Sequence, residues 1–164
     1  GEYTDISGHW AENAIKTLAR FGIGFSGNEF KPDSEITEKE FVALITSAVS
    51  DNSPVCITKS MIDNFGTYAP VSRGILKNGE EATDNAVTRS KAALWFARAM
   101  GYGDIAELYR IFVTPFSDVT ENIGAVAILS GLGVLNGTGD NTFSPNAHLT
   151  RAAAAMMIYN YYNK

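Results

Sequence analysis

The sequence predicts an all-α fold built from three helix-loop-helix repeats around one shared core. A short pattern occurs three times, at residues 36–39, 87–90 and 149–152: an aliphatic residue, a threonine and the first residues of an apolar segment. A threonine directly before an apolar stripe of 3.6-residue spacing is typical of a helix N-cap. Three such helix starts in one chain indicate an internal repeat.

Residues 1–50 are predicted to form the first repeat. Apolar residues at helical spacing predict its first helix: Trp10, Ala14, Ile15, Leu18 and Phe21. Gly22 follows in the position that a left-handed helix cap prefers. A glycine-rich turn then leads to a short extended segment that ends at Pro32, and a second helix is expected from Thr37 to about Val49.

Residues 116–164 are predicted to repeat the same order of elements. Residues 116–119 match residues 3–6, and a glycine-rich turn again follows the first apolar helix. Phe143 and Pro145 then correspond to Phe30 and Pro32. The helix after Thr150 carries an apolar stripe: Ala154, Met157, Ile158 and Tyr161. This unit is therefore a second complete copy of the repeat.

Residues 51–115 are predicted to be a degenerate middle repeat. A short apolar stripe opens it, at Ile57, Met61, Ile62 and Phe65, and another follows at Tyr68, Val71, Ile75 and Leu76. Its helix from Thr88 to about Met100 is clear, but the Phe-x-Pro pattern is missing. The extra length before the last repeat falls in residues 101–115, whose apolar spacing suggests an additional short helix. No linker is rich enough in Pro or Ser to separate the three units, so one compact domain is expected.

Composition excludes several functions. A net charge of −5, from 18 acids and 13 bases, argues against nucleic acid as a partner, because phosphates require a concentrated basic face. The longest apolar stretches end well short of the roughly 18 residues that cross a bilayer, so no transmembrane segment is expected. His9 and His148 lack neighbours at metal-ligand spacing, and the single Cys56 is expected to be a buried or merely tolerated thiol. Neither a metal nor a cofactor is predicted.

Two arginines are candidates for anion recognition. Arg89 and Arg151 each stand directly after a capping threonine. A guanidinium group can bind a carboxylate through two parallel hydrogen bonds. It would also stand beside a helix N-terminus, whose free N–H groups and dipole favour an anion. The alternative is that each arginine is a solvated first-turn residue paired with a nearby acid.

Other candidate ligand-binding residues have structural alternatives. Gly24, Gly27, Gly137 and Gly139 would let backbone amides approach a ligand, or they serve turn geometry alone. Residues 22–27 spell a dinucleotide fingerprint, but they follow a helix and no βαβ unit surrounds them. Trp10 could stack on a sugar, although packing of the first helix against the core is favoured. Asp5 and Asp118 either brace turns or bind a ligand hydroxyl.

The order of these residues resembles the S-layer homology repeat. The features that carry the resemblance are Asp5, His9 with Trp10, Ile15, Leu18, Gly22 with Ile23, Phe30-x-Pro32 and the helix that a threonine opens. The last repeat matches from Phe116 to Tyr161 without the tryptophan, and the middle one mainly in residues 87–90 and the helix that follows. Three such repeats normally make one cell-surface anchoring domain. The resemblance therefore implies a pseudo-threefold helical bundle with three grooves between neighbouring repeats.

The resemblance also implies a ligand and a location. Such modules bind secondary cell-wall polysaccharide, often pyruvylated, and hold surface-protein cargo outside the cell on a Gram-positive type envelope. The binding motif of the family is Thr-Arg-Ala-Glu, and its arginine, which engages the pyruvate carboxylate, corresponds to Arg89 and Arg151. In the first repeat this position is Glu38, so a groove built on it is expected to be inactive or changed. The glutamate of the motif is present only as Glu40, and Lys91 and Ala153 replace it elsewhere.

Two other classes of function remain alternatives. A glycosidase needs two carboxylates with separated pKa values across a cleft, and no acidic pair repeats along the chain. No nucleophile-elbow sequence is present either. A protein-docking module of a surface assembly, with glycan binding lost, is the second alternative. The sequence predicts a non-catalytic anchoring module with at most two working grooves.

Overall fold

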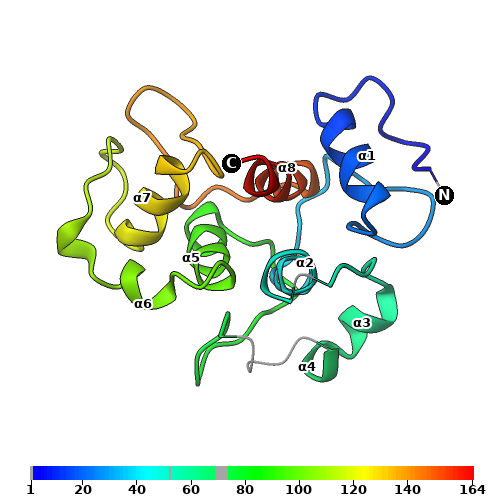
Figure 1. The fold of residues 1–164 in the computed structure, drawn as a ribbon, viewed down its shortest axis with the longest axis horizontal. Coiled ribbons are helices and arrows are strands. Elements are labelled where there is room, and N and C mark those ends of the chain that lie inside the picture. The colour runs from blue at the N-terminus through cyan, green and yellow to red at the C-terminus, as the bar shows by residue number, and fades with distance from the viewer. Residues whose placement is uncertain (1, 52, 69–73) are drawn as a thin grey trace.

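A computed structural model describes residues 2–51, 53–68 and 74–164 (Figure 1). These ranges contain helices and isolated β-bridges but no strand or sheet, which confirms the predicted all-α class. The helices are α1 (Glu12–Arg20), α2 (Glu38–Ile45), α3 (Lys59–Asp63), α4 (Phe65–Tyr68), α5 (Arg89–Ala99), α6 (Gly103–Ala106), α7 (Ile123–Gly131) and α8 (Arg151–Tyr162), with a π-helical turn η1 (Thr46–Ser50) and a 3-10 turn η3 (Tyr109–Ile111). Within the described ranges, no helix has the length and apolar character needed to cross a membrane.

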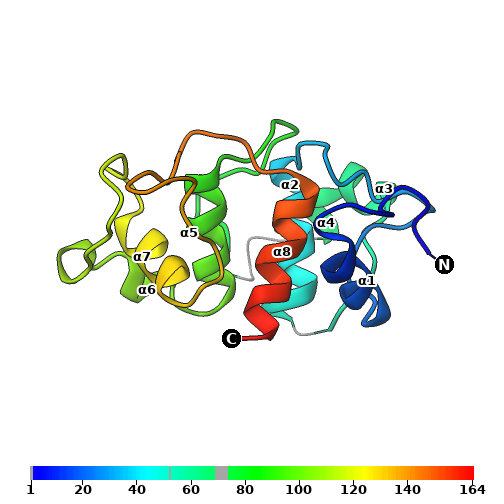
Figure 2. The ribbon, with the colours of Figure 1, turned by 90° about the horizontal axis from the view of Figure 1, so that it is seen from above.

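The three predicted threonine caps are confirmed. The side chains of Thr37, Thr88 and Thr150 each accept a hydrogen bond from the backbone N–H three residues later, at the start of α2, α5 and α8. A cap of this kind satisfies one of the N–H groups that a helix leaves without an internal partner. The three capped helices lie next to one another in the middle of the molecule (Figures 1 and 2).

A closed ring of backbone hydrogen bonds joins the segments before these helices. The N–H of Ile36 donates to the carbonyl of Leu149 (3.0 Å), that of Leu149 to Val87 (3.1 Å), and that of Val87 to Ile36 (3.0 Å). All three side chains are buried. The residue before each capping threonine thus meets the other two at one point. This ring supports the pseudo-threefold packing, which for the whole bundle stays a prediction.

The outer helices cover the central three. Helix α1 packs on α8, α6 and α7 pack on α5, and α3 and α4 pack on α2 (Figure 1). Ala14, Ile15 and Leu18 of α1 are buried as predicted. The predicted stripe is wrong at its ends, because Trp10 and Phe21 are 64% and 68% exposed. Both residues lie outside the regular helix, so their side chains do not follow its buried face.

The structure of residues 2–50 also tests the predictions for Gly22 and for the helix after Thr37. Gly22 has φ +78°, as expected of a left-handed helix cap. The helix after Thr37 extends through the predicted range, but its end is the π-helical turn η1 rather than α-helix. At this transition the hydroxyl of Thr46 donates to the carbonyl of Val42 at 2.7 Å. A threonine that bonds back one turn often distorts a helix in this way.

Within the middle unit, a buried arginine of α5 binds the residues that precede this helix, and sequence reasoning did not single it out. Nη1 of Arg98 donates to the carbonyl of Ile75 (2.9 Å) and to Oε1 of Glu80 (2.6 Å), and its Nη2 donates to Oε2 of Glu80 (3.2 Å). The first predicted stripe of this unit forms α3 and α4, with Ile57 and Phe65 buried. The second predicted stripe includes Val71, which lies outside the described residues.

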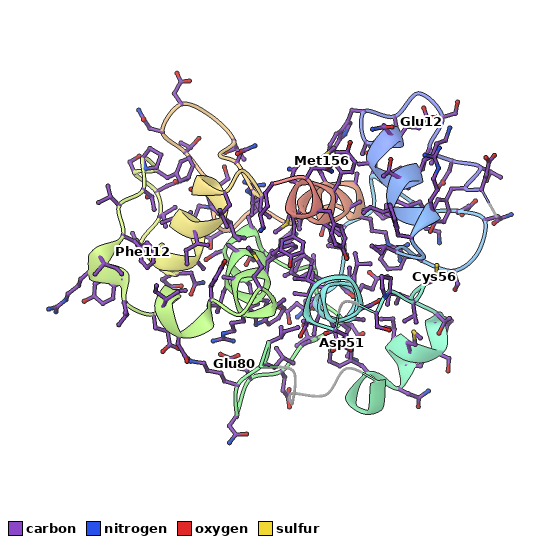
Figure 3. All side chains as sticks on the ribbon, in the orientation of Figure 1. Glu12, Asp51, Cys56, Glu80, Phe112 and Met156 are labelled. Atoms are coloured by element: carbon purple, nitrogen blue, oxygen red, sulfur yellow. The ribbon has the colours of Figure 1, made fainter. Side chains whose placement is uncertain are left out.

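The segment before the last repeat is helical, as its spacing suggested. It forms α6 and η3, but the apolar side chains of Ile105, Leu108 and Tyr109 are exposed. Only Ala106 of α6 is buried, and its backbone lies against Gly124 of α7. Figure 3 places Phe112 on the outer edge of this segment, away from the central helices. Close contact with α7 and packing on α5, rather than an apolar stripe, therefore hold α6 in place.

Candidate functional site

The candidate site consists of three junctions between repeats. At each one, the first residue of a threonine-capped helix reaches across to the loop of another repeat. We name them the Arg151 junction (α8 to residues 25–40), the Glu38 junction (α2 to Thr83 and Lys91) and the Arg89 junction (α5 to residues 136–143). In terms of the predicted repeats, the last thus contacts the first, the first contacts the middle, and the middle contacts the last.

At the Arg151 junction the guanidinium group is surrounded on three sides. Nη1 donates to the carbonyl of Phe30 (3.1 Å), and Nη2 forms an ion pair with Oε2 of Glu40. The guanidinium carbon lies 3.9 Å from the centroid of the Phe25 ring, a cation–π distance. The side chains of Arg151 and Glu40 are only 16% and 14% exposed. The predicted alternative, a solvated arginine paired with a nearby acid, is therefore right about the pairing but wrong about the solvation.

A surface pocket of about 420 Å³ opens beside this junction. Its lining mixes apolar, cationic, acidic and hydroxyl groups from both the first repeat and α3: Phe25, Ser26, Glu29, Lys31, Glu40, Ile57, Thr58, Lys59, Ile62, Asp63 and Arg151. Sequence reasoning missed the contributions of Phe25, Lys31 and Lys59. The aromatic residue within the glycine loop was an available signal, whereas the approach of α3 is a tertiary contact.

At the Arg89 junction, backbone carbonyls bind the guanidinium group as at the Arg151 junction, but no acid corresponding to Glu40 forms an ion pair with it among the described residues. Nε of Arg89 donates to the carbonyl of Phe143 (2.8 Å) and Nη2 to the carbonyl of Asn136 (2.5 Å). The guanidinium carbon lies 4.6 Å from the centroid of the Phe143 ring. Burial lowers the pKa of Arg89, and the charge of nearby Asp118 acts in the opposite direction. Arginine remains charged at neutral pH, so this junction presents a partly buried cation.

At the Glu38 junction the charge is reversed, as the sequence shows. Oε1 of Glu38 accepts hydrogen bonds from the N–H (2.9 Å) and hydroxyl (2.8 Å) of Thr83, and Oε2 accepts one from Nζ of Lys91 (2.8 Å). Burial would raise the pKa of this carboxyl, but the bonds from Lys91 and Thr83 outweigh it and lower the pKa. Glu38 is 5% exposed, so its charge is neutralised internally rather than directed at solvent.

The expectation that free helix N–H groups assist anion binding is wrong for α5 and α8. The N–H groups of Arg151 and Ala152 donate to the carbonyls of Ser34 and Pro32 (both 2.9 Å). The next N–H, that of Ala153, donates to the capping threonine. At α5 the corresponding groups donate to Ala147 (2.8 Å), Pro145 (2.9 Å) and Thr88 (3.2 Å). Loops of another repeat occupy both helix ends, so recognition would depend on side chains.

Asp5 and Asp118 brace the loops that the arginines contact. The carboxylate of Asp5 accepts from the N–H groups of Phe30 (2.9 Å) and Lys31 (2.8 Å). That of Asp118 accepts from Phe143 and Ser144, both at 2.9 Å. These bonds orient the Phe30 and Phe143 carbonyls that bind Arg151 and Arg89. The structure thus places both acids in the bracing role, and their binding of a ligand hydroxyl stays a prediction.

The bracing of the last loop is expected to depend on pH. Hydrogen bonds from Phe143 and Ser144 lower the pKa of Asp118 below its ordinary value of 3.8. The ionised group therefore stabilises the fold above pH 3.8, and this stability is lost as the pH falls through the lower folded pKa. Asp118→Asn should flatten the fall in unfolding free energy between about pH 5 and about pH 3, measured by urea unfolding. The matched variant Asp140→Asn, on an exposed acid of the same loop, should keep the wild-type profile.

At three of the four candidate glycines, an added Cβ would come too close to neighbouring atoms. A Cβ would lie 2.4 Å from the Tyr3 hydroxyl at Gly24, 2.4 Å from the Phe116 ring at Gly137, and 2.8 Å from the Thr142 hydroxyl at Gly139. Gly27 has φ +102° and open space around it. Turn geometry and packing account for these glycines, and amide contact with a ligand stays a prediction for each.

Trp10 is not part of the core, so the favoured interpretation of that residue is wrong. Its ring is largely exposed and lies 5.4 Å from the imidazole of His9. His9 accepts from the N–H of Ala11 (3.0 Å) and contacts Oδ1 of Asp33 (2.8 Å). Because the chain turns here into α1, Trp10 precedes the helix and points to solvent. Stacking of Trp10 on a sugar stays a prediction.

The two histidines and the single cysteine form local contacts in the described ranges. No group of three or more His, Cys, Asp or Glu side chains there could hold a metal ion. His148 contacts Oε2 of Glu35 (2.9 Å), a surface contact between repeats. Cys56 is exposed and lies between α1 and α3 (Figure 3), where its thiol contacts the Gly22 carbonyl at 3.5 Å. The fold and the junctions define the chain as an all-helical repeat module with charged inter-repeat sites.

Comparison with known protein families agrees with this class. The profile of the S-layer homology domain matches residues 2–42 and 115–155, together half of the chain. The chain therefore belongs to the S-layer homology domain family, a family of cell-surface anchoring modules. The matched stretches fall in the predicted first and third repeats. The interpretation of residues 51–115 as a middle repeat stays a prediction.

Several curated proteins are similar to the chain. The amylopullulanase of Thermoanaerobacterium thermosulfurigenes is 28% identical over 99% of the chain, which spans 10% of that protein. The exoglucanase XynX of Acetivibrio thermocellus is 28% identical over 99% of the chain, which spans 16% of it. The cellulosome-anchoring protein of Acetivibrio thermocellus is 29% identical over 49% of the chain, 19% of that protein. The chain thus matches only a minor part of each of these longer proteins.

Proposed function

We propose that the chain is a non-catalytic module that binds secondary cell-wall polysaccharide and thereby holds its protein on the outside of the cell. The observation that carries this proposal is that Arg151 and Arg89, each from one repeat, stand against the aromatic-containing loop of another. A cation that is positioned by backbone carbonyls and beside a phenyl ring suits an anionic sugar, whose ring has apolar faces and whose substituent is charged.

The pocket at the Arg151 junction supports a carbohydrate ligand. Its volume of about 420 Å³ is within the range of small-molecule sites, and hydroxyl groups of Ser26 and Thr58 line it beside charged and apolar groups. A pyruvate ketal on the polysaccharide would supply a carboxylate for a guanidinium group. This pyruvate ketal is the charged feature that the module recognises.

The relatives suggest what such a module carries. Two of them are named as polysaccharide-degrading enzymes and one as a cellulosome-anchoring protein, and the chain spans a small share of each. We propose that this chain likewise serves a larger surface protein or assembly as its attachment to the wall.

Co-sedimentation with protein-free cell-wall sacculi tests this function. The wild-type chain should pellet with native sacculi and stay in solution after mild acid removal of ketal pyruvate. The double variant Arg89→Gln/Arg151→Gln should lose at least about tenfold in affinity, since it removes both charge-assisted interactions. Arg20→Gln/Arg110→Gln is the matched control, because it removes two exposed arginines outside the junctions. Wild-type protein that is folded and does not pellet with native walls would refute the proposal.

One observation favours protein docking as a second candidate. Four exposed apolar residues lie on the segment that runs from α6 to the last repeat: Ile105, Leu108, Ile111 and Val113. Exposed apolar groups that gather in one place often mark contact with another protein. Retention that survives stripping of the polysaccharide, but not of wall proteins, would support this candidate over glycan binding.

A further inference from the structure

The sequence has two Asn-Gly pairs, and one of them lies against a guanidinium group. Nη2 of Arg89 donates to the backbone carbonyl of Asn136 at 2.5 Å, and the next residue is Gly137. Asn136 and Gly137 are both exposed to solvent. Neither the side chain of Asn136 nor the N–H of Gly137 has a hydrogen-bond partner among the described residues. Within the described ranges, the peptide group that joins the two residues is therefore bound at its oxygen and free at its nitrogen.

An asparagine that precedes glycine can react with the backbone that follows it. The glycine nitrogen, after losing its proton, attacks Cγ of the asparagine, because glycine has no side chain to hinder the approach. An N–Cγ bond forms, the bond from Cγ to the amide nitrogen breaks, and ammonia leaves with that proton. The product is a succinimide ring, which water then opens. Attack of water at Cγ gives aspartate, whereas attack at the backbone carbonyl gives isoaspartate, in which the main chain runs through the former side chain.

The contact with Arg89 favours the first step of this reaction. Removal of the Gly137 proton places negative charge on the carbonyl oxygen of Asn136, because the peptide group shares its electrons between nitrogen and oxygen. The guanidinium group already donates to this oxygen, so it stabilises the charge as it forms, in the manner of an oxyanion hole. Arg89 is also positioned by Phe143, whose carbonyl accepts from Nε at 2.8 Å and whose ring centroid lies 4.6 Å from the guanidinium carbon.

The same contact favours one of the two products. A hydrogen bond from the guanidinium group polarises the backbone carbonyl of Asn136, so water should attack the ring there and yield isoaspartate. This product lengthens the main chain by one methylene group before Gly137. The space beside Gly137 is already filled, because a Cβ there would lie 2.4 Å from the Phe116 ring and 2.7 Å from the Thr142 carbonyl. The loop of the last repeat must therefore rearrange when the modification occurs.

We propose that Asn136 is a site of self-modification, in which Arg89 promotes ring formation with Gly137 and directs ring opening to isoaspartate. The second pair, Asn78 and Gly79, is a reference within the same chain. Both of its residues are exposed, and no hydrogen bond to the Asn78 carbonyl is present in the described ranges. The two pairs have the same chemistry, so a difference in their rates in the folded chain comes from their surroundings. The reaction needs only water and does not depend on whether the chain binds a cell wall.

The test compares the two sites in one sample. The full chain is incubated at mildly alkaline pH, either folded or in urea, and deamidation at each site is followed by peptide mass spectrometry. In the folded wild type, Asn136 should react at least about fivefold faster than Asn78, because a charge-assisted hydrogen bond is stronger than a neutral one. In urea the two rates should become similar. The ratio of isoaspartate to aspartate at residue 136, measured by electron-transfer fragmentation, should be higher in the folded chain than in urea.

Three variants show whether the arginine is responsible. Arg89→Gln, checked by urea unfolding to be folded, should lower the rate at Asn136 to that at Asn78. Arg151→Gln removes the corresponding arginine of another junction and should leave the wild-type ratio of rates unchanged. Asn136→Gln should abolish the reaction at this site, because its longer side chain cannot form the five-membered ring.

Two results would overturn the proposal. One is an Asn136 that reacts no faster than Asn78 in the folded wild type, and the other is a ratio of rates that Arg89→Gln leaves unchanged or raises. If Arg89→Gln does not fold, the wild type decides by itself: a product ratio at residue 136 that is the same in the folded chain and in urea would then refute the role of the arginine.

Discussion

Phe96→Ala should lower the free energy of unfolding by about 3–5 kcal/mol. Phe96 lies on α5 and is fully buried, and its ring packs edge-on against Tyr161 of α8 at 5.8 Å between centroids. The substitution removes apolar burial and leaves a cavity between two of the central helices, which the surrounding side chains can fill only in part. Urea unfolding followed by far-ultraviolet circular dichroism measures the change.

Phe21→Ala provides the matched control. It removes the same atoms, but Phe21 is 68% exposed, so the unfolding free energy should change by no more than about 0.5 kcal/mol. The sequence predicted that Phe21 belongs to the apolar stripe of the first helix, and the structure exposes it. A loss at Phe21 that equals the loss at Phe96 would contradict the packing described for α1.

Gly124→Ala should destabilise the protein by about 1–3 kcal/mol, although alanine is the better helix former. A Cβ at Gly124 would lie 2.0 Å from the carbonyl oxygen and 2.8 Å from the carbonyl carbon of Ala106. These are backbone atoms, which cannot rotate away as a side chain can, so α6 and α7 would have to move apart. Thermal and urea unfolding both measure this loss.

Gly131→Ala is the control within the same helix. Gly131 ends α7, and a Cβ there would meet no atom from outside the helix within 4 Å, so the substitution should be neutral or stabilise by up to about 1 kcal/mol. If Gly124→Ala also proves stabilising, the close approach of α6 to α7 is wrong.

The sequence by itself determined the helical framework of this protein. The three helix starts are specified locally, because a threonine cap and the helix it opens lie within four residues of each other. The buried side chains of α1 and of most of α8 follow from apolar spacing for the same reason, whereas α2 and α5 are buried nearly all round. The two arginines of the candidate site could also be identified, because each stands at a fixed place after its cap.

Only the tertiary structure decided the partners of these groups. The helix N–H groups at α5 and α8 are occupied by loops of other repeats, and the acids Asp5 and Asp118 brace loops about 25 residues away in sequence. Glu40 and Lys91 become partners of Arg151 and Glu38 only when the repeats pack. Hydrogen bonds and ion pairs between repeats depend on distance in space, which periodicity along the chain does not contain. The same limit explains why packing was wrongly predicted for Trp10. The exposure of this side chain depends on where α1 begins and on what packs beside it.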